Sequence, residues 1–249
     1  MNLSIYKDYN DLSEHAAETI IALVSRTPDA VLCLASGDTP LLTYQLVVRK
    51  AIKNGIDFSQ CTFVGLDEWV GVPPTNEGSC HYFFYHHLFQ PLRISNGQIH
   101  LFDALSPDLA QECRKMEKII YAKNGIDLML VGIGMNGHIG FNEPGVSPNR
   151  YAHVVELDEI TRAVGQKYFP QPVVLSRGIT LGLQSFLEAK CAVLLASGVK
   201  KASVIRQTVE DEISPALPAS IIRNHSNGHM MLDEAAASAL TGKGTSQAI

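Results

Sequence analysis

One loop, residues 131–145, gathers several chemically active side chains among turn-forming glycines. It reads Val-Gly-Ile-Gly-Met-Asn-Gly-His-Ile-Gly-Phe-Asn-Glu-Pro-Gly and follows an apolar run, residues 126–133, typical of a strand buried on both faces of a parallel sheet. In open α/β sheets, ligands bind at the carboxyl ends of such strands. Asn136, His138 and Glu143 offer an amide, an imidazole and a carboxylate, and an imidazole can donate or accept a proton near neutral pH. These three are candidate catalytic residues, with a purely structural glycine-rich turn as the alternative.

A second group of polar residues follows the strand predicted over residues 30–34. Residues 36–40 read Ser-Gly-Asp-Thr-Pro and lead into a predicted helix over residues 41–54. Hydroxyls and backbone N–H groups at a helix amino terminus stabilise an anion, so this turn is a candidate phosphate site. Its candidate ligands are Ser36, Gly37, Asp38 and Thr39. The Asp38 carboxylate would repel a phosphate unless it points away, and Thr39 could instead be a simple N-cap.

Two acids end the next predicted strand, residues 61–66. Asp67 and Glu68 are followed by Trp-Val-Gly. Taken alone, an Asp-Glu pair at a strand end indicates solvated charges. A carboxylate held in a pocket could instead take up and return a proton.

Apolar and amphipathic segments alternate along the whole chain, which predicts an α/β fold. We expect a three-layer αβα, Rossmann-like arrangement with a mostly parallel sheet. Further strands are predicted at residues 99–102, 126–133, 179–181, 192–196 and 229–232, and further helices at residues 11–26, 79–89, 107–124, 184–189 and 200–209.

The chain is expected to form a single domain over residues 1–249, because it has no linker, internal repeat or low-complexity segment. Residues 145–176 are the least patterned part and lie beside the candidate catalytic loop, so they are a candidate lid, with a surface excursion as the alternative. Residues 241–249 are expected to form a disordered tail.

Composition excludes several classes of protein. Hydrophobic residues make up 46% and charged residues 18% of the chain, which disfavours disorder. The net charge of −5 argues against nucleic acid or an anionic membrane as partner. No apolar run is long enough to span a bilayer and no signal-peptide pattern is present, so we expect a cytoplasmic protein. Five cysteines and nine histidines show no metal-ligand spacing, so no metal is expected.

Three motifs together resemble the glucosamine-6-phosphate deaminase (isomerase) family. They are Gly-Met-Asn-Gly-His-Ile-Gly-Phe-Asn-Glu-Pro at residues 134–144, Asp-Glu-Trp-Val-Gly at residues 67–71 and Ser-Gly-Asp-Thr-Pro at residues 36–40. The resemblance covers roughly residues 10 to 236. It implies an enzyme that converts an amino-sugar 6-phosphate to a ketose 6-phosphate and ammonia, without a cofactor.

The resemblance also implies roles for individual residues. Asp67 falls on the base that moves a proton from carbon 2 to carbon 1 of the sugar. His138, held by Glu143, falls on the histidine that opens the pyranose ring, and Asn136 stands where the family usually has an aspartate. Lys167 and Lys201 fall on basic phosphate ligands; without the resemblance, both would be read as solvated surface charges.

The substrate and two other functions stay open. Three segments together resemble the branch acting on galactosamine 6-phosphate: Gly-Ser-Cys at residues 78–80 in place of Glu-Ser-Tyr, Asp-Glu-Trp at residues 67–69 and Ser-Arg-Gly-Ile-Thr-Leu-Gly-Leu at residues 176–183. Glucosamine and galactosamine 6-phosphate are therefore both candidates. A 6-phosphogluconolactonase-like hydrolase is an alternative, although such enzymes typically carry Gly-His-Thr-Ala-Ser in the catalytic loop. A non-catalytic sugar-phosphate sensor is another, although the ten residues before the first helix leave no room for the helix-turn-helix that usually accompanies one. Partners are expected to be small molecules, with a homo-oligomer possible.

Overall fold

A seven-stranded parallel sheet forms the centre of the molecule. The computed structural model describes residues 1–242, and every neighbouring pair of strands in this sheet is parallel. In spatial order the strands are β1 (Asn2–Tyr6), β10 (Gly228–Asp233), β9 (Ala192–Ala196), β6 (Leu128–Gly132), β2 (Val31–Leu34), β3 (Thr62–Gly65) and β5 (Ile99–His100). The predicted mostly parallel sheet is confirmed.

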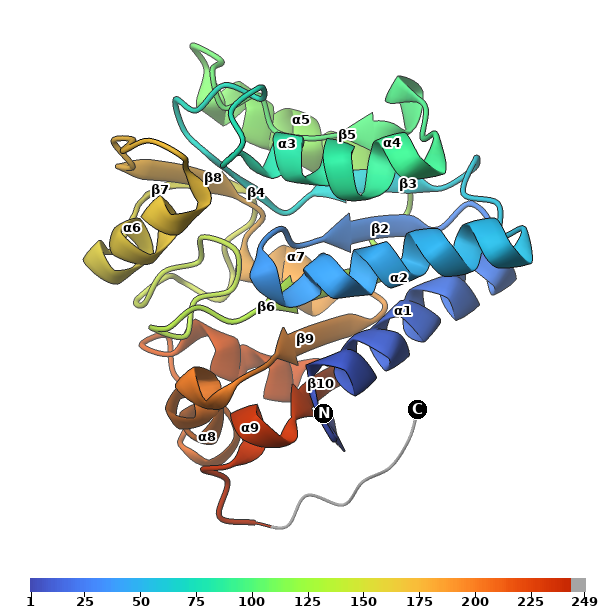
Figure 1. Cartoon of the computed structure of the whole chain (residues 1–249). Helices are drawn as coiled ribbons and strands as arrows, with labels where there is room; N and C mark the ends of the chain where they lie inside the picture. The colour runs from blue at the N-terminus through green and yellow to red at the C-terminus, as the bar shows by residue number, and fades with distance from the viewer. Residues whose placement is uncertain (243–249) are drawn as a thin grey trace.

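Helices cover both faces of this sheet, which confirms the three-layer fold (Figure 1). Alternate side chains of each strand enter different cores; Leu32 of β2 packs into one and its neighbour Cys33 into the other. One face is covered by α1 (Tyr9–Arg26), α2 (Asp38–Asn54), α3 (Cys80–Phe84), the π-helical turn η1 (Tyr85–Phe89) and α4 (Gln90–Leu92). The other face is covered by α5 (Leu109–Ala122), α7 (Leu183–Glu188), α8 (Ala202–Glu210), η5 (Pro218–Asn224) and α9 (Glu234–Ala237).

A small antiparallel sheet lies beside the main sheet, with α6 (Glu159–Gly165) next to it (Figure 1). Its strands are β4 (Asp67–Trp69), β8 (Arg177–Thr180) and β7 (His153–Glu156). A buried cluster holds it together, formed by Trp69, Val72, Phe141, Leu157, Phe169 and Leu175. The strand predicted over residues 179–181 is present as β8, but it lies in this antiparallel sheet rather than in the main sheet, because it pairs with β4 and β7.

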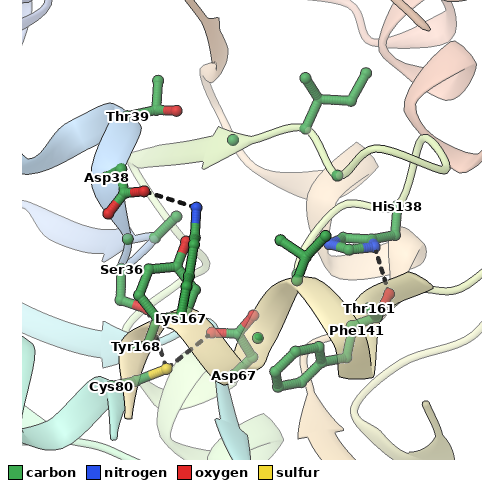
Figure 2. A pocket seen from close by; sticks show the side chains of 18 of the residues that line it. Ser36, Asp38, Thr39, Asp67, Cys80, His138, Phe141, Thr161, Lys167 and Tyr168 are labelled. Atoms are coloured by element: carbon green, nitrogen blue, oxygen red, sulfur yellow. Dashed lines mark hydrogen bonds and ion pairs between the residues drawn. The ribbon is translucent and has the colours of Figure 1, made fainter. Parts of the chain in front are cut away.

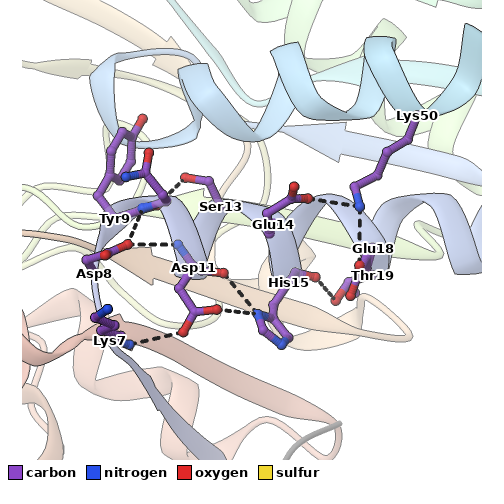
Figure 3. A network of polar contacts seen from close by, with 11 residues as sticks. Lys7, Asp8, Tyr9, Asp11, Ser13, Glu14, His15, Glu18, Thr19 and Lys50 are labelled. Carbon is purple, nitrogen blue, oxygen red and sulfur yellow. Dashed lines mark hydrogen bonds and ion pairs between the residues drawn. The ribbon is translucent and has the colours of Figure 1, made fainter. Parts of the chain in front are cut away.

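The two helices that precede and follow β2 hold each other in place. Asp8 caps α1 by accepting from the N–H groups of Asn10 and Asp11, and Lys50 of α2 bridges two glutamates of α1 (Figure 3). The Tyr9 hydroxyl donates to the Asp38 carbonyl and accepts from the Leu42 N–H. Ion pairs near the surface contribute little to folding stability, so the hydrogen bonds of the Tyr9 hydroxyl matter most for fixing the start of α2.

Several element ends differ from the sequence prediction. Helix α2 begins at Asp38 rather than Leu41, with Gly37 as its N-cap at φ 108°; Pro40 is tolerated in the first turn because no helical N–H bond is lost there. Thr241 is not part of a disordered tail, since its N–H and hydroxyl both donate to Glu210. The rest of the predicted tail, residues 243–249, lies outside the described residues. No helix among residues 1–242 is long and apolar enough to cross a membrane.

Candidate active site

A cavity of about 760 Å³ opens where four neighbouring strands of the main sheet end. The chain leaves β2 for β3 on one side and returns to β6 on the other, which makes this a topological switch point, where α/β sheets bind ligands. The cavity brings together eight of the ten predicted site residues, namely Ser36, Gly37, Asp38, Thr39, Asp67, His138, Lys167 and Lys201. The other two, Asn136 and Glu143, lie behind His138 rather than on the cavity wall.

The two acids of the Asp-Glu pair have different environments. Glu68 is buried and accepts hydrogen bonds from the backbone N–H groups of Trp69, Cys80 and His81, so it holds the start of α3. Asp67 is partly exposed and lines the cavity. Because alternate residues of a strand point to opposite sides, β4 sends one carboxylate into the structure and the other toward a ligand.

The environment of Asp67 favours its protonated form. Burial is the main cause, followed by the negative charge of Glu68, while a hydrogen bond from Cys80 opposes both; together they raise the pKa of Asp67 from 3.8 to about 7. A carboxylate with a pKa near the working pH is suited to taking up and returning a proton.

The loop after β6 places His138 over the backbone of Gly134. A Cβ atom on Gly134 would lie 2.3 Å from the imidazole, so this position requires glycine. The Gly134 N–H also donates to the His138 carbonyl at 2.9 Å, and Gly137 turns the chain between them at φ 82°. The glycines predicted to shape this loop therefore fix the position of the ring.

Three side chains surround the Nδ1 side of His138. The Thr161 hydroxyl is 3.0 Å from Nδ1 and Glu143 Oε2 is 3.6 Å from it. Asn136 donates to the same Glu143 oxygen at 2.9 Å and accepts from the His138 N–H. With Nδ1 occupied in this way, the opposite ring nitrogen is left for a ligand.

Glu143 is held in its charged form. Burial acts to raise its pKa, but hydrogen bonds from His138, Thr161 and Asn136 and the charge of His138 outweigh it, so the pKa of Glu143 lies below its usual value. An ionised Glu143 fixes the proton of the neutral imidazole on Nδ1 of His138, the nearer ring nitrogen, and so leaves the opposite nitrogen free to accept a proton.

The turn predicted to bind phosphate carries an ion pair. Lys167 Nζ lies 2.6 Å from the Asp38 carboxylate (Figure 2). The Tyr168 ring packs beside Gly37, where a Cβ atom would meet its hydroxyl at 3.1 Å. Asp38 thus holds the segment after α6 against the turn, which gives a structural reason for a carboxylate at this position.

A second lysine approaches the same cavity from the end of β9. Lys201 ends the 3₁₀ turn η4 (Val199–Lys201) and donates to the Ile133 carbonyl at 2.5 Å. Burial, with a smaller contribution from the nearby Lys167 ammonium, lowers the pKa of Lys201 from 10.5 to about 8. An anion between the two lysines would restore the preference for the charged form.

Two residues in direct contact with the predicted site were not assigned a role from sequence. Thr161 contacts His138, and the Cys80 thiol contacts Asp67. Both contacts join segments far apart in the chain, so spacing carries no signal for them. Among residues 1–242, no three His, Cys, Asp or Glu side chains come together as metal ligands would.

The chain is similar to proteins of one family over almost its whole length. The family model for glucosamine-6-phosphate isomerases/6-phosphogluconolactonase matches residues 7–232. A glucosamine-6-phosphate deaminase of Shouchella clausii is 41% identical over 98% of this chain and 99% of its own, and one of Bacillus pumilus is 41% identical over 96% and 99%.

Solved structures show the same relationship. A monomeric glucosamine-6-phosphate deaminase has a TM-score of 0.93 and 36% identity, covering 96% of this chain and all of the other. The 6-phosphogluconolactonase of Trypanosoma brucei has a TM-score of 0.76 at 19% identity over 96% and 98%, a likeness of fold alone. The chain therefore belongs to the glucosamine-6-phosphate isomerase/6-phosphogluconolactonase family.

Proposed function

We propose that the protein is an amino-sugar-6-phosphate deaminase/isomerase that converts glucosamine 6-phosphate to fructose 6-phosphate and ammonia. One observation carries this proposal: Asp67, a carboxylate with a pKa near 7, shares a cavity with the imidazole of His138, whose Nδ1 is held by Glu143. The named relatives at about 40% identity support the same reaction.

The phosphate would occupy the turn after β2. The N–H groups at the start of α2 face the same cavity as Lys167 and Lys201, so partial positive charge and two ammonium groups meet there. The sugar carbons would then extend toward Asp67 and His138.

The chemistry would proceed in two proton-transfer stages. The free nitrogen of His138 takes up the proton that the carbon 1 hydroxyl loses and delivers it to the ring oxygen, which opens the pyranose to an aldehyde. Asp67 then removes the proton from carbon 2, and a proton passes from the carbon 2 ammonium to the carbon 1 oxygen, which gives an enolamine. Asp67 returns its proton to carbon 1. Carbon 2 is left as an iminium ion; water adds to it, ammonia leaves, and the carbon becomes the ketone of the product.

We further propose that residues 145–176 act as a lid within a single domain. The segment contains β7 and α6, contributes Thr161 to the His138 contact, and reaches the phosphate turn through Lys167. A moving lid would therefore carry a phosphate ligand and a partner of the histidine together. The five free cysteines suit the reducing cytoplasm as its location.

Substrate comparison tests the proposed function. Ammonia and ketose 6-phosphate should form in equal amounts from glucosamine 6-phosphate. Faster release from galactosamine 6-phosphate would assign the protein to that substrate instead. Hydrolysis of 6-phosphogluconolactone without ammonia release from either amino sugar would favour the lactonase alternative, and binding without turnover would favour a sensor.

The lowered pKa of Lys201 predicts a pH-dependent KM. Below about pH 8 the ammonium is charged in the free protein and can bind phosphate; above that pH it loses its proton and binding weakens. KM should therefore rise toward tenfold per pH unit above pH 8. A Lys201→Ala variant should have a higher KM at pH 7, and its KM should lack the rise above pH 8 that deprotonation of Lys201 causes. The ionisations of the substrate affect the wild type and the variant alike. A ratio of their KM values that stays constant across pH 7–10 would therefore argue against the role of Lys201.

The Asp38–Lys167 pair predicts a gain of affinity on neutralising Asp38. The pair is well exposed, so it is worth at most about 1 kcal/mol, and phosphate competes with Asp38 for the same ammonium. Asp38→Asn should lower KM up to about fivefold. In a Lys167→Ala background the same substitution should have a smaller effect, as a double-mutant cycle would measure. An equal effect in both backgrounds would show that Asp38 does not act through Lys167.

A further inference from the structure

The Cys80 thiol links the phosphate turn to the carboxylate of Asp67. The Ser36 hydroxyl lies 3.1 Å from Cys80 Sγ, and Sγ lies 3.6 Å from Asp67 Oδ1 (Figure 2). Cys80 is only 5% exposed and is the first residue of α3, where its own N–H donates to Glu68. Its position is therefore fixed by the backbone of the helix start rather than by a flexible side chain.

We propose that Cys80 is a positioning residue for the reaction: its thiol donates a hydrogen bond to one oxygen of Asp67, stabilises the carboxylate, and leaves the other oxygen directed at the substrate. This inference rests on the proposed function of Asp67 as the base. Ser36 donates to the sulfur in turn, so the position of the base is tied to the turn that would hold the phosphate.

The thiol keeps its proton over the working pH range. Burial, with the nearby charges of Glu68 and Asp67, holds the pKa of Cys80 well above its usual value. Among the described residues, Cys80 is the one side chain that hydrogen-bonds to Asp67. A thiol is a weak donor, but a partly buried carboxylate with a single side-chain donor depends on that donor.

The other ionisable groups around Asp67 do not duplicate this contact. Glu68 of β4 accepts from the backbone N–H groups of Cys80 and His81 at the start of α3 and opposes ionisation of Asp67 by its charge. Cys33 of β2 and Tyr44 of α2 are fully buried, and their pKa values are raised by burial first, so both stay neutral. The other charged or titratable side chains that line the cavity, besides Asp67 and Cys80, are Asp38, Glu77, His138, Lys167, Tyr168, Lys200 and Lys201.

The test is the pH profile of kcat/KM for the variants Cys80→Ala and Cys80→Ser. Asp67 must be ionised to act, so activity rises with pH through its pKa. In Cys80→Ala, the loss of a weak hydrogen bond should move this acid limb of the profile to higher pH by about 0.5 to 1 pH unit. Activity would then fall about three- to tenfold at pH 6, and about twofold or less at pH 8. Cys80→Ser keeps a donor, so its limb should lie at or below that of the wild type.

Cys33→Ala is the matched control, because it removes another buried thiol near Asp67 that makes no hydrogen bond to it. Its acid limb should not move. A Cys80→Ala profile lowered equally at every pH, or a Cys80→Ser limb raised as far as that of Cys80→Ala, would overturn the proposal.

If Cys80→Ala does not fold, Cys80→Ser is compared with the wild type: an acid limb at lower pH than that of the wild type supports the proposal, and a limb at higher pH overturns it. Should the wild type release no ammonia at all, the proposed function would fail first. Titration of the Asp67 carboxyl by ¹³C NMR would then test the hydrogen bond separately, with an unchanged pKa in Cys80→Ala counting against it.

Discussion

Replacing Asp67 by asparagine is expected to lower kcat by about 10²- to 10⁴-fold, the usual cost of losing a general base. The amide is nearly isosteric but cannot take up the carbon 2 proton. The loss should fall on kcat rather than on binding, because the lysines that would hold the phosphate make their contacts elsewhere: Lys167 pairs with Asp38, and Lys201 donates to the Ile133 carbonyl. Stopped-flow or coupled assays of ammonia release measure the rate, and an open-chain amino-alditol 6-phosphate measures binding.

Asp29→Asn is the matched control, since Asp29 is an exposed carboxylate that precedes β2, at the end of the strand opposite the cavity. It should leave kcat and KM unchanged. Near wild-type turnover of Asp67→Asn would remove Asp67 from the mechanism, whereas an equal loss of affinity for the amino-alditol phosphate would make it a binding residue.

Replacing His138 by glutamine is expected to lower kcat/KM for the cyclic sugar by about 10²- to 10⁴-fold as well. Glutamine retains hydrogen-bonding capacity but cannot carry a proton to the ring oxygen. Affinity for the open-chain amino-alditol phosphate should change little, because that ligand needs no ring opening. The two assays together separate a defect in ring opening from a defect in binding.

His15→Gln removes a half-exposed imidazole of α1 (Figure 3) that does not line the cavity, and it should keep kcat within about twofold of the wild type. An unimpaired His138→Gln variant would leave ring opening to solvent or to another group. Equal loss of affinity for the cyclic and the open-chain ligand would indicate that His138 mainly shapes the cavity.

The main sheet was predictable because its central strands are continuous apolar runs that a parallel sheet buries on both faces. Edge strands carry less signal. Strand β1, Asn-Leu-Ser-Ile-Tyr, mixes polar and apolar residues at the sheet edge and was missed. Strand β7 was missed because its pairing depends on β8, more than twenty residues later.

Candidate site residues were predictable where they follow strands, since the carboxyl ends of parallel strands meet at one edge. That argument places Ser36, Asp67 and His138 together, as observed. It could not find Thr161 or Cys80, which reach the site from helices packed against it. Nor could the position after a strand show which of Asp67 and Glu68 faces the cavity, because that depends on where the N–H groups of α3 lie.

The central claim is that ammonia leaves only after a proton has been moved from carbon 2 to carbon 1. The most direct test uses glucosamine 6-phosphate deuterated at carbon 2. The mechanism predicts that one deuterium leaves carbon 2 for each ammonia released and is recovered at carbon 1 of the ketose phosphate or in solvent, and that Asp67→Asn abolishes both events together. Ammonia release with the deuterium still on carbon 2, and an aldose phosphate as product, would contradict it.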